Sequence, residues 1–304
     1  MSKFNWATGS QILLAGLGCA SITAGSALGT ERAGIPDFSG MWGRNAFNFE
    51  PMPTGPRPLT NLRRRPDGTG DANKLVGDYN NPILKPQAAE IVKEKGELSI
   101  AGRNYPDPSN QCSAYAPPFT FAMQLGLQIL QQKDRVTMIY NQDDQVRHMR
   151  LNSKHPAQVT PSPMGDSIGH YEGDTLVIDT VGIKTGRVAI IDRYGTPHSN
   201  ALHVVERYRL IDGAKAKEAA ERHIKEDGSA GLGGNVAVDP DYKGMGLQLQ
   251  FTVEDEKMFT TPWSAAVTYR RIKGPWTEQI CAENFHEYHT GNDTEIPRAD
   301  KPDF

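Results

Sequence analysis

The feature that most constrains the fold is a series of short runs in the second half of the chain in which apolar and polar residues alternate. Two pairs of runs are joined by short polar turns, as in β-hairpins: 136–140 with 145–151, and 166–171 with 175–181. Further runs of strand-like composition follow at 202–211, 247–254, 265–272 and 278–285. Because almost no helical pattern separates them, these runs predict a mainly β fold, either an antiparallel β-barrel or a strongly curved meander sheet.

The first part of the chain has a different composition. Residues 35–81 are rich in Pro, Gly and Arg, which favours a long extended N-terminal arm. One or two short helices are expected, at 85–95, where Gly96 would end the helix, and at 214–226, facing solvent. The crowded apolar stretch 110–130 is expected to plug or line a cavity. The expected organisation is a signal peptide at 1–27, an arm with cavity-lining loops at 28–132, the barrel at 133–290 and a tail at 291–304.

Charge and motif content exclude several functions. The formal net charge is −3, so the chain offers no basic surface for nucleic acid. No apolar run is long enough for a membrane-spanning helix. No phosphate-binding glycine loop follows a strand, and no haem, flavin or HExxH signature is present, so neither an organic cofactor nor a metal is expected. A small molecule is the expected partner, and the oligomeric state is left open.

The N-terminus has the order of a secretory signal peptide. Lys3 precedes a short apolar stretch at 12–17, and small residues follow up to Ala27, where we expect cleavage. The protein would then be periplasmic or secreted; the alternative is an uncleaved cytoplasmic N-terminus. Removal of this segment leaves Cys112 and Cys281, an even pair that predicts a disulfide in an oxidising compartment. A free, buried pair of thiols is the alternative.

Candidate functional residues are found where a charged side chain shares a strand face with apolar neighbours. Glu206 lies on the face of Val204 and Tyr208, and Asp179 lies within the apolar run 175–181. Whichever face of the run 145–151 points inward carries an arginine with it. A structural salt bridge within the sheet is the alternative to a functional role for Glu206.

We expect Glu206 and His198 to perform acid and base chemistry, with Asp179 orienting one of them. Arg150 is expected to bind a substrate carboxylate. Tyr208 and Trp263 are expected to contact the substrate. His198 lies in a loop just before the strand of Glu206, and simple exposure of this loop histidine is the alternative.

Three segments resemble a large, mostly uncharacterised family of secreted bacterial proteins that is abundant in sphingomonads and related degraders of aromatic and terpenoid compounds. These segments are GDSIGHYEGDTLVIDTVG at 165–182, PHSNALHVVERY at 197–208 and TPW at 261–263. The resemblance covers about residues 36–287 and implies a lipocalin-like sheet. The chain departs from the family pattern by the helix expected at 214–226 and by Ala282, where a histidine is expected after the cysteine.

A small barrel can enclose one ligand among apolar side chains and a few polar groups. We therefore expect a cofactor-independent lyase, such as a decarboxylase, acting on an aromatic or similarly apolar organic acid. The alternatives are a periplasmic lipocalin-like binding or carrier protein without chemistry, and a structural envelope protein.

Overall fold

The computed structural model describes residues 34–103, 105–124, 126–186, 188–227 and 244–272, together with two short strands near the C-terminus. The expected signal peptide, the strand expected at 278–285 and Cys281 lie outside the described residues. None of the helices in the described ranges combines the length and the apolarity needed to span a bilayer.

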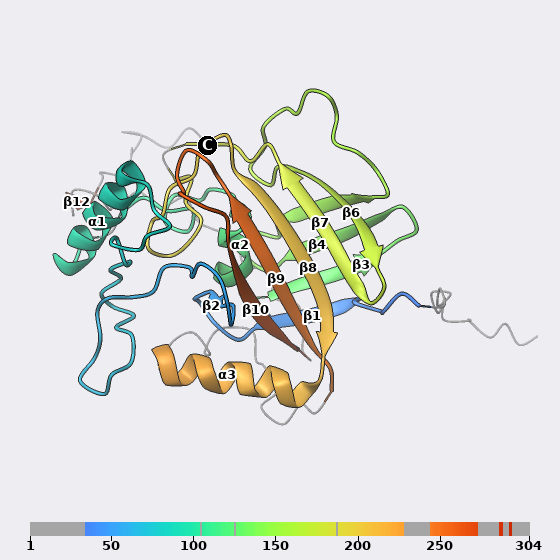
Figure 1. Cartoon of the computed structure of the whole chain (residues 1–304), viewed down its shortest axis with the longest axis horizontal. Coiled ribbons are helices and arrows are strands. Elements are labelled where there is room, and N and C mark those ends of the chain that lie inside the picture. The colour runs from blue at the N-terminus through green and yellow to red at the C-terminus, as the bar shows by residue number, and fades with distance from the viewer. Residues whose placement is uncertain are drawn as a thin grey trace, which may run out of the picture. The chain divides into compact units, whose positions relative to one another are not determined.

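Nine strands of the described chain close into a barrel in the order β1-β3-β4-β5-β6-β7-β8-β9-β10, and β10 returns to pair with β1 (Figure 1). Their bounds are Gly40–Arg44 (β1), Gly126–Gln131 (β3), Arg135–Tyr140 (β4), Val146–Leu151 (β5), Asp166–Glu172 (β6), Thr175–Val181 (β7), His203–Ile211 (β8), Gly246–Glu254 (β9) and Trp263–Arg271 (β10). The short strand β2, Glu50–Pro51, pairs with β10 outside this closed set. Strands β11, His286–Glu287, and β12, Asn292–Asp293, pair only with each other within the described chain. The predicted mainly β barrel is confirmed.

One strand pair departs from the expected meander, because β5 and β6 run parallel, with Met149 opposite Ser167. The other pairings of the barrel are antiparallel. A parallel pair requires a crossover of roughly a dozen residues or more, because the chain must return to the start of the next strand. The connection 152–165 makes this return.

The barrel also begins earlier in the chain than the boundary expected at residue 133. Strands β1 and β3 both come from the segment expected to be an arm with loops. β1 closes the barrel between β3 and β10, and its Trp42 is fully buried and donates a hydrogen bond from Nε1 to the Phe38 carbonyl at 2.9 Å. A strand this short contains too little alternation for its sequence to reveal it.

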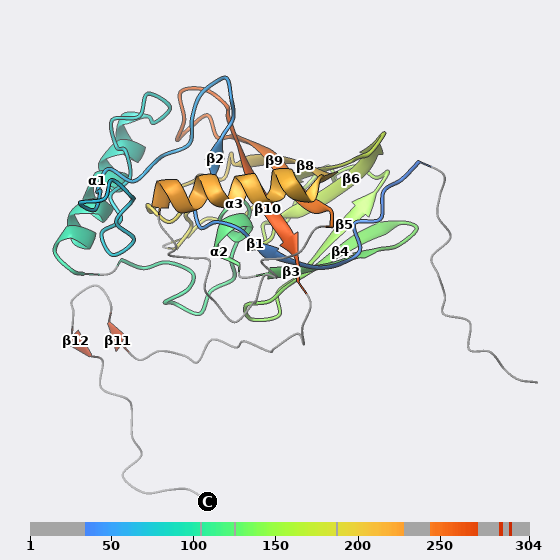
Figure 2. The same ribbon diagram turned by 90° about the horizontal axis from the view of Figure 1, so that it is seen from below.

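The described chain contains three helices, of which α1 spans Pro86–Ile100 and α3 spans Gly213–Asp227. α1 continues through Gly96, which was expected to end it, because Gly96 lets the helix approach Val76: a Cβ there would lie 2.9 Å from Val76 Cγ1. α3 lies along the outside of β9 and β10 (Figure 2). Its Ala216 is buried and packs close to Gly246 of β9, so α3 has one buried face and is not wholly solvent-facing.

The short helix α2, Phe119–Met123, lies between the barrel core and the loops around it. Phe121 packs against Phe251 of β9 with ring centroids 5.2 Å apart, and its carbonyl accepts a hydrogen bond from Tyr269 Oη of β10 at 2.7 Å. Phe119 belongs to a separate apolar cluster with Tyr105, Tyr115 and Ile190. α2 therefore has one side in the barrel core and the other outside it, which agrees with the plugging role expected for residues 110–130.

Candidate functional site

Glu206 points into the barrel, as the alternation of its strand predicted, and is fully buried. Its carboxylate is bound by Arg147 of β5, with Nη1 2.9 Å from Oε2 and Nη2 2.5 Å from Oε1. Tyr208 Oη donates a hydrogen bond to Oε2 at 2.9 Å. Both carboxylate oxygens are thus occupied by protein donors, as in the structural salt bridge that was the alternative to catalysis.

The hydrogen-bond donors of Arg147 also have protein partners. Its Nε donates to Ser167 Oγ at 3.1 Å and its Nη2 donates to Thr180 Oγ1 at 2.6 Å. Burial lowers the pKa of Arg147, but the carboxylate of Glu206 more than offsets this effect, so the pKa stays above its ordinary value. The interior of the barrel at this level is a polar network in which the two charged groups bind each other and neighbouring side chains.

Arg150, expected to bind a substrate carboxylate, is not the inward-facing arginine of β5. On β5 the side chains of Arg147, Met149 and Leu151 are buried, while Arg150 lies on the opposite face with its side chain 44% exposed. Arg150 forms a two-pronged ion pair with Asp166, at 2.8 and 2.9 Å. It neither faces Glu206 nor lines an internal cavity.

Asp179 also lies on the outer face, at the centre of a cluster that we call the outer histidine cluster: His155, Asp166, Asp179, His203 and Glu254. Asp179 Oδ1 lies 3.1 Å from His203 Nε2 and 3.0 Å from His155 Nε2. The other ring nitrogens face Asp166 at 2.6 Å and Glu254 at 3.3 Å. The hydrogen bond from His203 lowers the pKa of Asp179, and the same bond raises the pKa of His203. Asp179 therefore orients surface histidines, and the sequence had not singled these out.

His198 is buried in the loop before β8, so simple exposure of this histidine is excluded. Its Nδ1 lies 3.1 Å from the Ser199 carbonyl, and its Nε2 is buried without a hydrogen-bond partner among the described residues. Burial lowers the pKa of His198, which favours the neutral ring. The neighbouring Ser199 binds Asp255 through its backbone N–H and its hydroxyl, which fixes the loop.

Tyr208 and Trp263, both expected to bind substrate, are core residues. Tyr208 is 1% exposed and donates to Glu206, and Trp263 is 2% exposed. Trp263 packs edge-on against Phe251 and Phe259, with centroids 6.0 and 5.9 Å apart. Both side chains are thus part of the packed interior.

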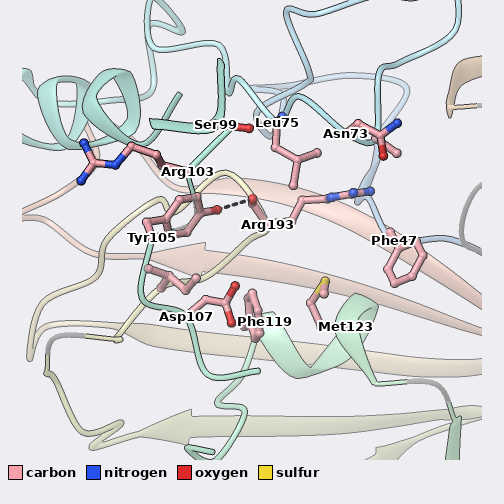
Figure 3. Close-up of a pocket in the computed structure, with 12 residues that line it drawn as sticks. Phe47, Asn73, Leu75, Ser99, Arg103, Tyr105, Asp107, Phe119, Met123 and Arg193 are labelled. Carbon is pink, nitrogen blue, oxygen red and sulfur yellow. Dashed lines mark hydrogen bonds between the residues drawn. The ribbon is translucent and has the colours of Figure 1, made fainter. Parts of the chain in front are cut away.

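A pocket of about 460 Å³ lies outside the barrel strands, among the C-terminal end of α1, α2 and four loops (Figure 3). We call it the arginine pocket. Its lining residues are Phe47, Ala72, Asn73, Leu75, Ser99, Arg103, Tyr105, Asp107, Phe119, Met123, Ile190 and Arg193. None of the six residues predicted for the site lines this pocket. Its lining residues lie on loops and helix ends, where the sequence shows no strand alternation.

Arg193 is the most distinctive group of the arginine pocket. Its Nε is buried and has no hydrogen-bond partner among the described residues, and its guanidinium carbon lies 5.1 Å from the centre of the Phe47 ring. The guanidinium carbon of Arg44 lies 3.5 Å from the centre of the same ring. Arg44 Nη1 donates to the carbonyls of Ala122 and Met123, at 3.0 and 2.6 Å, while its buried Nη2 has no partner among the described residues.

Arg44 and Arg193 form a pair of like charges. Burial, followed by the charge of Arg193, lowers the pKa of Arg44 to about 9. Within the described residues neither arginine forms an ion pair with a carboxylate. Partly buried guanidinium groups without an anion are costly, so this end of the pocket favours a negatively charged ligand.

Tyr105 and Asp107 form the opposite wall, on the loop after α1. Tyr105 Oη donates to the carbonyl of Arg193, and burial raises the pKa of Tyr105 well above its ordinary value. Asp107 Oδ1 accepts hydrogen bonds from Ser109 Oγ at 2.6 Å and from the Asn110 backbone N–H at 3.0 Å. The wall is thus held in place by its own hydrogen bonds.

No protein-family model, curated protein or solved structure matches the chain. The resemblance to a family of secreted bacterial proteins therefore stays a prediction, and function is argued from the site alone. Among the described residues, no group of three or more His, Cys, Asp or Glu side chains is arranged to hold a metal ion.

The buried pair yields a stability prediction. We expect Arg147→Met and Glu206→Leu each to lower the free energy of unfolding by about 3–5 kcal/mol, because each leaves one unpaired charge in the core. The double variant should recover most of this loss, since it removes both charges. Urea unfolding followed by circular dichroism measures all three values. Additive losses in the double variant would show that the two charges do not stabilise each other.

The outer histidine cluster yields a pH prediction. The pKa of His203 is raised in the folded chain, so its stabilising effect is complete below about pH 6.5 and is lost as the pH rises through the folded-state pKa. Solvent screening limits the effect to about 0.5 kcal/mol. We expect the free energy of unfolding to fall less between about pH 5 and about pH 9 in His203→Gln than in the unmodified chain. His170→Gln, on the same outer surface but paired only with Glu172, serves as the control. Equal slopes in all three proteins would contradict the prediction.

Proposed function

We propose that the chain binds a small apolar organic acid in the arginine pocket, with the acid group at Arg193. The observation that carries the proposal is that Arg193 lines the pocket with a buried Nε that has no hydrogen-bond partner among the described residues. A carboxylate is the natural complement of a guanidinium group, because its two oxygens can accept two parallel hydrogen bonds.

The dimensions and the lining of the arginine pocket support this ligand class. Its volume of about 460 Å³ falls within the range of small-molecule sites, roughly 300–1,000 Å³. Phe47, Leu75, Phe119, Met123 and Ile190 supply apolar contacts for the body of the ligand. Apolar walls combined with a few polar and charged groups, of which Arg193 is the proposed anchor, are typical of a site that orients an organic acid.

A binding or carrier role is the function best supported by this geometry. Glu206 was expected to take part in acid–base chemistry and Asp179 to orient it or His198, but Glu206 is closed inside the barrel and Asp179 lies on its outer surface. A cofactor-independent lyase acting on the same acid is the second candidate, and Asp107 is the observation that favours it. This carboxylate lines the same pocket as Arg193 and could exchange a proton with a bound ligand.

We propose the signal peptide, a periplasmic or secreted location and the disulfide together. A signal peptide would direct the protein to an oxidising compartment, and a disulfide is stable there. Cys112 lies five residues after Asp107 and has a left-handed backbone conformation, with φ of 45°. A bond from Cys112 to Cys281 would tether the loop that forms one wall of the arginine pocket. A role in the catabolism of aromatic or terpenoid compounds follows only from the family resemblance.

Removal of the proposed anchor tests the binding function. We expect aromatic and terpenoid acids to bind saturably in calorimetry, and Arg193→Met to weaken this binding at least about tenfold, because it deletes a charge-assisted hydrogen bond. Arg207→Met is the matched control, since Arg207 is an exposed arginine on the outside of the barrel that pairs with Glu172. Equal affinity in Arg193→Met, or no saturable binding at all, would overturn the proposal.

The same acids, incubated with the protein without added cofactor, separate the two candidates. Product formation that is lost in Asp107→Asn would favour the lyase. Saturable binding without product would favour the carrier.

The disulfide has its own test. A non-reduced digest should contain one linked peptide with Cys112 and Cys281, and reduction should lower the melting temperature, since a disulfide contributes about 2–4 kcal/mol. Cys112→Ser should melt at the same temperature with and without reductant. Alkylation of both thiols in the non-reduced protein would contradict the pairing.

A further inference from the structure

A second pocket, of about 600 Å³, lies next to β2, β10 and α3. We call it the helix pocket. Its lining includes Asn48 and Phe49 before β2, Leu59 of the arm, Ala219 of α3 and Val267 of β10. It is larger than the arginine pocket and shares none of that pocket's lining residues.

A narrow gap of about 10 Å³ separates the two pockets. It shares Phe47, Phe119, Met123 and Arg193 with the arginine pocket. It shares Asn48, Phe49, Leu59 and Tyr194 with the helix pocket. The two pockets therefore lie back to back, and the gap between them has room for about one water molecule.

Loop residues 45–49, between β1 and β2, form part of the wall between the two pockets. Phe47 is the residue of this loop that lines the arginine pocket. The Phe47 ring is held by the guanidinium groups of Arg44 and Arg193, at 3.5 and 5.1 Å. On the other side, Tyr194 Oη donates to Asn48 Oδ1 at 3.1 Å. In Figure 3, Phe47 and Arg103 lie on opposite sides of the pocket, with Arg193 between them.

We propose that Phe47 determines the ligand specificity of the arginine pocket, because it closes the side of the pocket next to Arg193 and so restricts the ligand to compact acids. The inference rests on the proposed binding function. Arg193 lines both the arginine pocket and the gap, so an acid held there has its body in the arginine pocket. The gap toward the helix pocket, which Phe47 lines, has room for about one water molecule, so the body of the ligand does not pass through it. The ligand class is thereby narrowed to acids with one or two rings or a short chain.

The dependence of affinity on chain length tests this role in the full chain. The probes are linear carboxylates from butanoate to dodecanoate, titrated by calorimetry below their micellar concentrations. Each methylene that leaves water should raise the affinity about fourfold. We expect this gain to stop in the unmodified chain once the arginine pocket is filled. In Phe47→Ala it should continue through the longer acids, because the two pockets become connected.

Three further variants keep the test decisive. Leu75→Ala enlarges the arginine pocket without touching the gap, so its gain should not extend to the longest acids. Phe47→Leu keeps part of the side chain at this position, so the chain length at which the affinity stops rising should be intermediate. This variant also provides the test if Phe47→Ala melts at too low a temperature to be titrated. Arg193→Met reports on the anchor separately.

The outcomes for the two proposals can be told apart. Binding that depends on Arg193 but stops at the same chain length with and without Phe47 would overturn the specificity role and leave the binding function intact. If no acid binds the unmodified chain, both proposals fail. A limit that moves in Phe47→Ala and not in Leu75→Ala would support both.

Discussion

The buried ion pair between Arg147 and Glu206 is the constraint on which the rest of the structure depends. Two opposite charges removed from water are tolerated only when each is paired and its remaining hydrogen-bonding groups are met. Ser167, Thr180 and Tyr208 meet them here. They bring β5, β6, β7 and β8 together around one network. This part of the barrel interior is therefore structural, and the ligand site that we propose lies elsewhere.

The helix α2 connects the structural interior of the barrel with the arginine pocket outside it. Phe121 and the contact with Tyr269 commit one side of α2 to the core. Phe119 and Met123, on the same short helix, line the arginine pocket. The rigidity of the packed barrel is thus passed to a pocket that contains no strand residues. A site made of loops gains a fixed wall in this way, and a fixed wall reduces the ordering that a ligand would otherwise have to induce.

Strand alternation in the sequence was enough to predict the barrel and the inward position of Glu206. It could not decide which face of β5 turns inward, because both faces carry an arginine, and that choice depends on closure of the whole sheet. The role expected for Asp179, orienting Glu206 or His198, rested on its apolar neighbours along the strand, but its side chain lies on the outer face beside His155 and His203. β1 and β3 escaped prediction for a different reason: β1 is too short to show a period, and β3 lies at the end of the crowded apolar stretch 110–130.

The arginine pocket was beyond the reach of any periodic signal, because it joins residues from four separate loops and helix ends. The one physical clue is the charge balance. Inside the barrel, Arg147 and Glu206 neutralise each other at 2.5 Å. Beside Phe47, burial and the charge of Arg193 lower the pKa of Arg44, and no carboxylate of the described chain pairs with either arginine. A fold that satisfies one buried arginine so completely and leaves two others without an anion has a location at which an acidic ligand would stabilise it.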